Sequence, residues 1–329
     1  MHTNFSRALT ALILLVSTTS QADLLVKNQY ALQSSTSFPE GVAFDPVSDT
    51  FFPTAIFGGQ ITTVRGFDGQ EGLFYQDTTT PGISFGGIKV DAARRMAWVC
   101  GTNALASPVP TSWIYGIRIR PGQTGQLLHR IELPAPSFCN DIALDAFGRV
   151  YASDSFQPTI YRVAADNSSY EVFATNPAFA AVPGGPPFGL NGIQVTPDQS
   201  HLIAIRTITP ALFSVSMSNP SDVQAVSFTG DTFQPAGDFV RFPGPDGLAF
   251  LGLKAYVVSN GAVQQLKFTN SSFTQAEVKT NTTVPLGITS ATTAYGKLYV
   301  INSQVVPVVD FGQPVTLPFT INKVDLSGF

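Results

Sequence analysis

Apolar and polar side chains alternate with a period of two in six related stretches of the chain. Each stretch has one variable residue, then Gly or Asp, and then alternating apolar positions, a pattern typical of β-strands. Successive copies start 46, 54, 51, 55 and 40 residues apart, counted from the variable residue. The six copies span residues 39–45, 86–91, 140–145, 191–195, 246–250 and 286–289.

A turn and a second β-rich run follow these copies, at residues 50–54, 96–100, 149–152, 201–206, 255–259 and 297–302. Repeats of this length that each hold a hairpin are typical of propeller blades. We therefore predict an all-β fold, a six-bladed β-propeller. An extended segment at 23–32 precedes the first copy, and we expect it to pair with 320–326 in the last blade. That pairing would close the ring and leave no open sheet edge.

Composition agrees with a single β-rich domain over residues 23–329. Gly and Pro number 28 and 24, which supplies many turns, and only 12% of the residues are charged. The net charge is −4 and no basic run occurs, so the chain lacks the electrostatic footprint of a nucleic-acid-binding protein.

Residues 1–22 have the features of a secretory signal peptide. Arg7 precedes an apolar core at residues 8–16, and Ser20-Gln21-Ala22 fits a cleavage site. The apolar core is too short to span a membrane. We expect a secreted glycoprotein, since three Asn-x-Ser/Thr sequons begin at Asn167, Asn270 and Asn281.

The two cysteines, Cys100 and Cys139, lie on either side of a predicted blade boundary. Cys100 ends the second strand of blade two, and Cys139 immediately precedes the first strand of blade three. In a propeller these positions fall on the same face of adjacent blades. A disulfide between them is therefore expected in an oxidising compartment, with two buried free thiols as the alternative.

The first strand of each blade is expected to start at the mouth of the central channel. We call this end of the propeller the mouth face and the opposite end the base face. Connections that lead into first strands or leave second strands then gather on the mouth face. The long ones are 75–85, 101–112, 176–189 and 303–318, and loops of this length are often functional.

The variable residues at the head of the first strands should meet around the channel mouth. In blade order they are Glu40, Gly86, Asn140, Asn191, Asp246 and Leu286. Four oxygen-bearing side chains around one axis predict a site for a hard cation, Ca²⁺ or Mg²⁺. The sequence leaves open whether catalysis requires this cation. The alternative is that Asn and Asp merely satisfy backbone N–H groups where loops become strands.

These short motifs resemble the gluconolactonase/regucalcin family of six-bladed propellers. The resemblance rests on Glu40-Gly41, Asn140-Asp141, Asn191-Gly192 and Pro245-Asp246-Gly247, and it covers essentially the whole chain after the signal. It implies that Glu40, Asn191 and Asp246 hold a divalent metal and that Asn140 lies on the substrate side. Lactonases of that family have an Arg two residues before the blade-three Asn, where this chain has Phe138.

An aromatic pocket wall with polar groups suits an apolar substrate better than a sugar lactone. Arg206 is a nearby candidate cation. The predicted substrate-binding residues are Phe85, Asn103, Trp113, Phe138, Phe156, Phe188, Asn260 and Asn302.

In its general appearance the chain also resembles the fungal hetero-Diels–Alderases of tropolonic sesquiterpenoid biosynthesis. That resemblance implies a tropolone o-quinone methide that adds to a humulene-type alkene, with tropolone and sesquiterpene as the small-molecule partners. Asp246, Glu40, Asn140 and Arg206 are then the candidate catalytic residues, either directly or through a bound cation. A metal-dependent lactonase and a secreted binding propeller without catalysis are the two alternatives.

Overall fold

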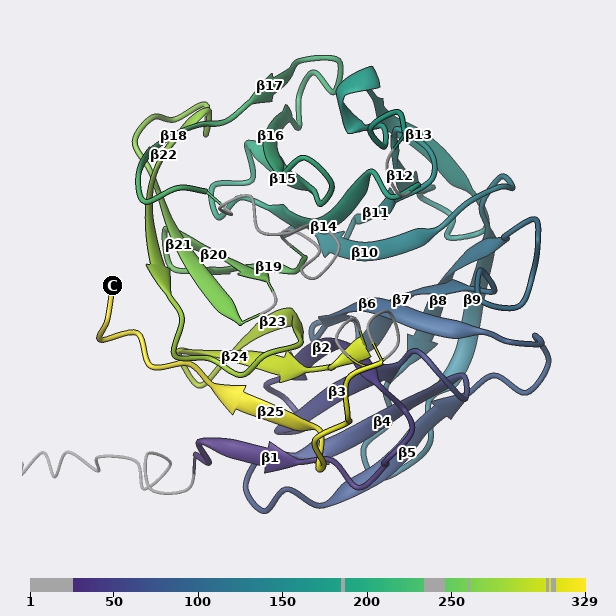
Figure 1. The fold of residues 1–329 in the computed structure, drawn as a ribbon. Helices are drawn as coiled ribbons and strands as arrows, with labels where there is room; N and C mark the ends of the chain where they lie inside the picture. The colour runs from purple at the N-terminus through teal and green to yellow at the C-terminus, as the bar shows by residue number, and fades with distance from the viewer. Residues whose placement is uncertain (1–25, 185–186, 234–245, 260, 306–307, 309–311) are drawn as a thin grey trace, which may run out of the picture.

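Six β-sheets form the described part of the chain and follow one another around a common axis (Figure 1). The computed structural model describes residues 26–184, 187–233, 246–259, 261–305, 308 and 312–329. The expected signal peptide at 1–22 lies outside the described residues. The predicted all-β, six-bladed propeller is confirmed.

The two inner strands of each blade coincide closely with the predicted repeat. The innermost strands are β2 (Pro39–Asp45), β6 (Ser84–Asp91), β10 (Cys139–Leu144), β14 (Leu190–Val195), β19 (Leu248–Leu251) and β23 (Ile288–Ala294). The second strands are β3 (Thr50–Ala55), β7 (Met96–Thr102), β11 (Val150–Asp154), β15 (His201–Arg206), β20 (Lys254–Ser259) and β24 (Lys297–Asn302). All six inner pairs are antiparallel.

Two outer strands complete each blade; the third strands are mostly buried, and most of the fourth strands are largely exposed. The third strands are β4 (Gln60–Arg65), β8 (Ser112–Arg118), β12 (Thr159–Val163), β16 (Ala211–Ser216), β21 (Ala262–Phe268) and β25 (Thr320–Lys323). The fourth strands are β5 (Glu71–Gln76), β9 (Gln126–Glu132), β13 (Tyr170–Thr175), β17 (Val223–Ala225), β22 (Gln275–Asn281) and β1 (Gln29–Ala31). A short 3-10 helix, η2 (Pro177–Phe179), lies between β13 and β14.

The chain ends close the ring as predicted. β1 pairs antiparallel with β25, with Gln29 opposite Asn322 and Ala31 opposite Thr320. The last blade therefore combines strands from both ends of the chain, which covers the edge that β25 would otherwise expose. At the axis, the Thr289 hydroxyl of blade six donates to the Glu40 carbonyl oxygen of blade one at 2.8 Å.

One additional strand links blades four and five. β18 (Ser227–Gly230) follows β17 almost directly, but it pairs in parallel with β22 at the outer edge of blade five. The sequence repeat did not predict this strand. It covers the edge of blade five and makes that sheet five-stranded.

The hydrophobic core lies between the facing sheets of neighbouring blades. Between blades one and two, for example, Phe52 and Phe74 share a buried cluster with Ile88 and Tyr115. The disulfide between Cys100 of β7 and Cys139 of β10 is present, as predicted, and joins blades two and three. A disulfide of this kind is typical of proteins that fold in an oxidising compartment.

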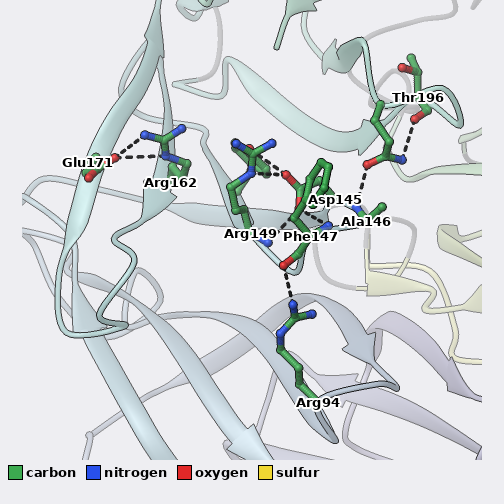
Figure 2. A network of polar contacts seen from close by, with 10 residues as sticks. Arg94, Asp145, Ala146, Phe147, Arg149, Arg162, Glu171 and Thr196 are labelled. Carbon is green, nitrogen blue, oxygen red and sulfur yellow. Dashed lines mark hydrogen bonds and ion pairs between the residues drawn. The ribbon is translucent and has the colours of Figure 1, made fainter. Parts of the chain in front are cut away.

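Turns at the base face join neighbouring blades through side chains (Figure 2). Arg94 of blade two donates from Nη2 to the carbonyl oxygen of Phe147 in blade three at 2.6 Å. The backbone N–H of Ala146 in turn donates to Oε1 of Gln199 in blade four at 2.7 Å. These contacts link blades two, three and four at the base face.

Candidate functional site

The glycine of the repeated motif lets the heads of neighbouring inner strands touch. A Cβ atom on Gly41 would lie 2.5 Å from the Gly86 carbonyl oxygen, and one on Gly192 would lie 2.3 Å from the Asp246 carbonyl oxygen. Both distances are far below van der Waals contact. The backbone N–H of Gly192 donates to the same Asp246 oxygen at 3.1 Å. The motif therefore has Gly because the strand heads approach closely at the axis.

Blade three carries Asp141 where the other five blades have Gly. Its Oδ1 accepts the Ile142 N–H at 2.8 Å, and its Oδ2 accepts the N–H of Ile193 in blade four at 3.0 Å. Asp141 is buried, and the neighbouring Gly87 leaves the space that its side chain occupies. Sequence reasoning treated Asp141 as part of a strand motif, and its place at the blade three and four junction was missed.

Three carboxyl groups from distant parts of the chain interact electrostatically at the axis. Burial raises the pKa of Asp246 to about 8; the charge of Asp141 adds to this, and a hydrogen bond from Asn191 opposes it. Burial also raises the pKa of Glu40 well above its usual range, with further contributions from Asp246 and Asp141 and opposition from Lys89. Burial likewise raises the pKa of Asp141. At neutral pH the Asp246 carboxyl is therefore mostly protonated.

The two asparagines of the ring have equivalent surroundings in adjacent blades. Nδ2 of Asn140 donates to the Ser155 hydroxyl at 3.0 Å, and Nδ2 of Asn191 donates to the Thr207 hydroxyl at 2.9 Å. Each hydroxyl group belongs to the turn that follows the second strand of the same blade. These bonds orient the carboxamides and leave Oδ1 of each side chain as an acceptor for a ligand.

The donor set fits the chemistry of a hard cation. Glu40 is partly exposed as a residue, but its Oε2 is buried and has no hydrogen-bond partner. An orphaned carboxylate oxygen beside a second carboxyl, Asp246, and the amide of Asn191 is a combination that Ca²⁺ or Mg²⁺ can use. Among the described residues, no group of three or more His, Cys, Asp or Glu side chains is arranged to hold a metal ion. A cation here would therefore depend on the amide oxygens.

Three of the predicted wall residues form an aromatic cluster beside Asn140. The ring centroids of Phe138, Phe156 and Phe188 lie 5.4, 5.5 and 5.6 Å apart in the three pairs. Phe138 and Phe156 are half-buried and Phe188 is exposed, so the cluster has an accessible apolar surface. We call these three residues the aromatic trio.

A buried carboxyl below the trio, Asp154, holds its backbone in place. Oδ1 of Asp154 accepts the N–H groups of Phe138, Phe156 and Gln157 at 3.0, 2.9 and 3.1 Å. Its Oδ2 is buried without a hydrogen-bond partner, and burial raises the pKa of this carboxyl. Sequence reasoning missed Asp154. The available signal was an acidic residue directly before a turn at the end of a strand.

The adjacent Ser155 connects the trio to the ring. Its N–H donates to the Phe138 carbonyl oxygen at 2.9 Å, and its carbonyl oxygen accepts the N–H of Gly189, next to Phe188, at 2.7 Å. Its hydroxyl also receives the Asn140 bond described above. One turn thus positions both the aromatic trio and a polar residue of the ring.

Two other predicted wall residues belong to the core. Phe85 is fully buried between Tyr75 and Tyr115, and Trp113 is buried in the same cluster. Nε1 of Trp113 donates to Glu132 at 3.1 Å. Both side chains therefore pack in the core between blades one and two, and a role for Phe85 and Trp113 in substrate binding stays a prediction.

The remaining predicted polar residues mainly organise loops. Oδ1 of Asn103 accepts the Thr111 N–H at 2.8 Å across the β7–β8 connection, and Nδ2 of buried Asn302 donates to the Leu286 carbonyl oxygen at 2.5 Å. Asn260 lies outside the described residues. These contacts give Asn103 and Asn302 positioning roles.

Arg206 is also held by backbone groups. Nη1 donates to the Ala178 carbonyl oxygen at 2.9 Å, while Nε and Nη2 donate to the Thr209 carbonyl oxygen at 3.2 and 2.9 Å. Burial lowers the pKa of Arg206. The guanidinium therefore joins η2 to the β15–β16 turn, and the catalytic role predicted for Arg206 stays a prediction.

The three sequons differ in their surroundings. Asn167 lies in the β12–β13 turn with partial exposure, and Asn270 hydrogen-bonds to Thr274 within its own turn. Asn281 is buried, and its Nδ2 donates to the Asp325 carbonyl oxygen at 3.0 Å. A glycan on Asn281 would need this contact to open, so Asn167 and Asn270 are the better-placed acceptors.

A separate cleft lies near the base face. It has a volume of about 570 Å³ and is lined by residues of blades one and two, including Thr50, Arg65, Phe74 and Arg120. None of the predicted site residues lines it.

Searches for related proteins found similarity at the level of structure. No protein-family model matches the sequence, and no curated protein matches it. The Malassezia sympodialis allergen Mala s 1 aligns with a TM-score of 0.72 at 17% identity, covering 92% of this chain and 97% of that one.

Two further solved structures are similar in fold. A gluconolactonase from Xanthomonas campestris aligns with a TM-score of 0.57 at 16% identity, covering 93% of this chain and 94% of that one. A putative glucose dehydrogenase from Thermus thermophilus aligns with a TM-score of 0.60 at 15% identity over 90% of this chain and 99% of that one. At these identities the comparisons establish a six-bladed β-propeller like those of gluconolactonases and Mala s 1.

Proposed function

We propose that the channel-mouth site is the active centre of an enzyme that acts on a small hydrophobic substrate. The aromatic trio beside Asn140 is the observation that carries this proposal. An accessible aromatic surface next to buried carboxyl groups can bind an apolar body and act on an oxygen function attached to it. Phe138 stands where the resembling lactonases carry an Arg for a sugar acid, which favours the apolar class.

The reaction we propose is a hetero-Diels–Alder reaction on a tropolone that carries a hydroxymethyl group. Asp246, mostly protonated at neutral pH, donates its proton to the hydroxymethyl oxygen as the C–O bond breaks and water leaves. The tropolone hydroxyl returns a proton to the carboxylate, which leaves a neutral o-quinone methide. A humulene-type alkene then forms one C–C and one C–O bond with it, without further proton or electron transfer.

The trio contributes orientation and exclusion of water in this scheme. A quinone methide reacts readily with water, so a wall of Phe138, Phe156 and Phe188 protects it and holds the hydrocarbon partner close. The raised pKa of Asp246 suits a carboxyl group that first donates a proton and then takes one back.

Incubation of the full protein with a hydroxymethyl tropolone and humulene tests this proposal. We expect more adduct, with a defined stereochemistry, than in buffer. Phe138→Arg should lower adduct formation at least roughly tenfold, because it buries an unpaired charge in the apolar wall. Phe138→Leu, the matched control, should retain most activity. An adduct yield equal to that in buffer would contradict the proposal, and ligand binding without turnover would indicate a binding propeller.

A metal-dependent lactonase is the second candidate, favoured by the orphaned Oε2 of Glu40. Glu40, Asn191 and Asp246 would hold the cation, which when bound polarises a lactone carbonyl. Calorimetric titration with Ca²⁺, together with hydrolysis of a lactone panel with and without chelator, tests this candidate. Absence of Ca²⁺ binding and unchanged lactone levels would remove it.

A further inference from the structure

The connections on the two faces of the propeller differ sharply in charge. Eight of the eleven base-face connections carry a charged side chain, for example Arg94, Arg120 and Asp166. In the described residues of the mouth-face connections, the charged side chains are Asp77 and Asp231 besides the axial Asp246, and there is no Lys or Arg.

Of these mouth-face charges, Asp77 is buried and Asp231 lies far from the axis, at the outer edge of blade five. Asp77 is buried and accepts hydrogen bonds from Thr79, Thr80 and Tyr115. Asp231 follows β18 at the outer edge of blade five, where its Oδ2 accepts the N–H of Thr280 at 2.7 Å. Asp246 lies at the axis, so the described loop surface around the mouth is essentially uncharged.

Apolar side chains protrude from this uncharged face in several blades. Leu105 is 62% exposed in the β7–β8 connection, and Leu286 is 63% exposed in the β22–β23 connection. Phe57, Phe188 and Leu317 are also exposed, in three further mouth-face connections. Exposed apolar residues occur on the base face too, but there they lie among charges.

Internal hydrogen bonds hold these apolar side chains at the surface. In the β7–β8 connection, the Asn103 carbonyl oxygen accepts the Ala106 N–H at 2.9 Å, which shapes the turn around Leu105. In the β24–β25 connection, Gln304 bonds to both N–H and C=O of Thr316 at 2.7 and 2.6 Å, beside Leu317. The loops are thus organised without burying their apolar tips.

We infer that the mouth face docks onto an uncharged lipid surface, a zwitterionic phospholipid bilayer. Separate apolar tips around a ring suit a fluid layer that can admit each tip individually, whereas a rigid protein partner would need a matching pit for every one. The described mouth-face connections hold no Lys or Arg, and the two arginines that reach them from strands, Arg130 and Arg206, are bonded to Thr80 and to backbone carbonyl groups. This argues against recognition of anionic headgroups. No helix among the described residues is long and apolar enough to cross a membrane, so the attachment is peripheral.

This inference does not depend on the reaction proposed above. It has a consequence for any substrate, because the channel mouth would open toward the acyl layer and a lipophilic molecule could enter without crossing water. The Arg130 and Glu132 side chains, which contact Trp113 on the flank of blade two, would mark the outer limit of the contact.

Vesicle flotation with the full protein and phosphatidylcholine vesicles tests the docking. We expect binding that does not rise when phosphatidylserine is added and does not fall at high salt. Leu105→Asp should lower the bound fraction roughly tenfold, and Leu105→Asp with Leu286→Asp should abolish it. Leu253→Asp is the matched control, because Leu253 is 81% exposed in the β19–β20 turn on the base face.

Three results would contradict docking to a zwitterionic bilayer. The first is that the protein does not bind phosphatidylcholine vesicles at all, and the second is that it binds only anionic vesicles in a way that salt reverses. The third is an equal fall of the bound fraction in the Leu105→Asp and Leu253→Asp variants. Light scattering of the protein without vesicles tests the other possibility, that a second copy of this chain binds the mouth face. A dimer that Leu105→Asp dissociates, without any vesicle binding, would assign the face to a second copy of this chain. Circular dichroism and thermal melting of each variant exclude misfolding as the cause.

Discussion

Replacement of Asp246 by Asn should change how the stability of the protein depends on pH. Burial raises the pKa of this carboxyl from 3.8 to about 8. An acid with a raised native pKa favours folding only while it is protonated. The stabilisation is thus complete below about pH 4 and is lost progressively as the pH rises to about 8.

The size of the effect follows from the pKa. A rise of the pKa from 3.8 to about 8 corresponds to several kcal/mol, and between pH 5 and pH 7 the free energy of unfolding should fall by about 1 kcal/mol or more per pH unit. Asn has the shape of the protonated acid and does not titrate. The Asp246→Asn variant should therefore lack this component of the slope.

Urea unfolding of wild type and Asp246→Asn at pH 5, 6, 7 and 8, with a chelator present, measures the difference directly. Comparison of the two proteins cancels the contributions of other titrating groups that do not contact this site. We expect the two curves to converge toward low pH and to separate toward high pH, with the variant the more stable. Parallel curves would refute the assignment of a buried, high-pKa carboxyl to Asp246.

Three further predictions concern positioning and packing. Asp154→Ala should destabilise the fold by about 3 kcal/mol in urea unfolding, because three N–H groups lose their acceptor. Asp154→Asn should cost less because it keeps Oδ1, and equal losses in the two variants would contradict this. Gly192→Ala should cost about 2 kcal/mol or more by the same measurement, since its Cβ would lie 2.3 Å from a carbonyl oxygen; an unchanged midpoint would contradict the close approach. Removing the disulfide by Cys100→Ser with Cys139→Ser should cost about 4 kcal/mol for a sequence separation of 39, and a thermal midpoint equal to wild type would argue against it.

The sequence predicted the fold well because each blade is a local unit. The alternating pattern and the repeated glycine define the inner hairpins, and β2, β15 and β24 have the predicted bounds within one residue. The closing strand and the disulfide were predictable as well, since both follow from where a ring of blades places positions far apart in the chain. β18 was not, because its parallel pairing with β22 has no counterpart in the repeat.

The blades, their closed ring and the residues at the heads of the inner strands could all be predicted from the repeat in the sequence. Which aromatic residues stay partly exposed and which are buried between blades, as Phe138 and Phe85 are, depends on the packing of the blades against one another. The tertiary structure also placed Asp141 and Asp154 at buried positions that their short motifs did not reveal. The physical reason is that strand periodicity is a local property, whereas burial, and with it the pKa of a carboxyl such as Asp246, depends on neighbours contributed by other blades.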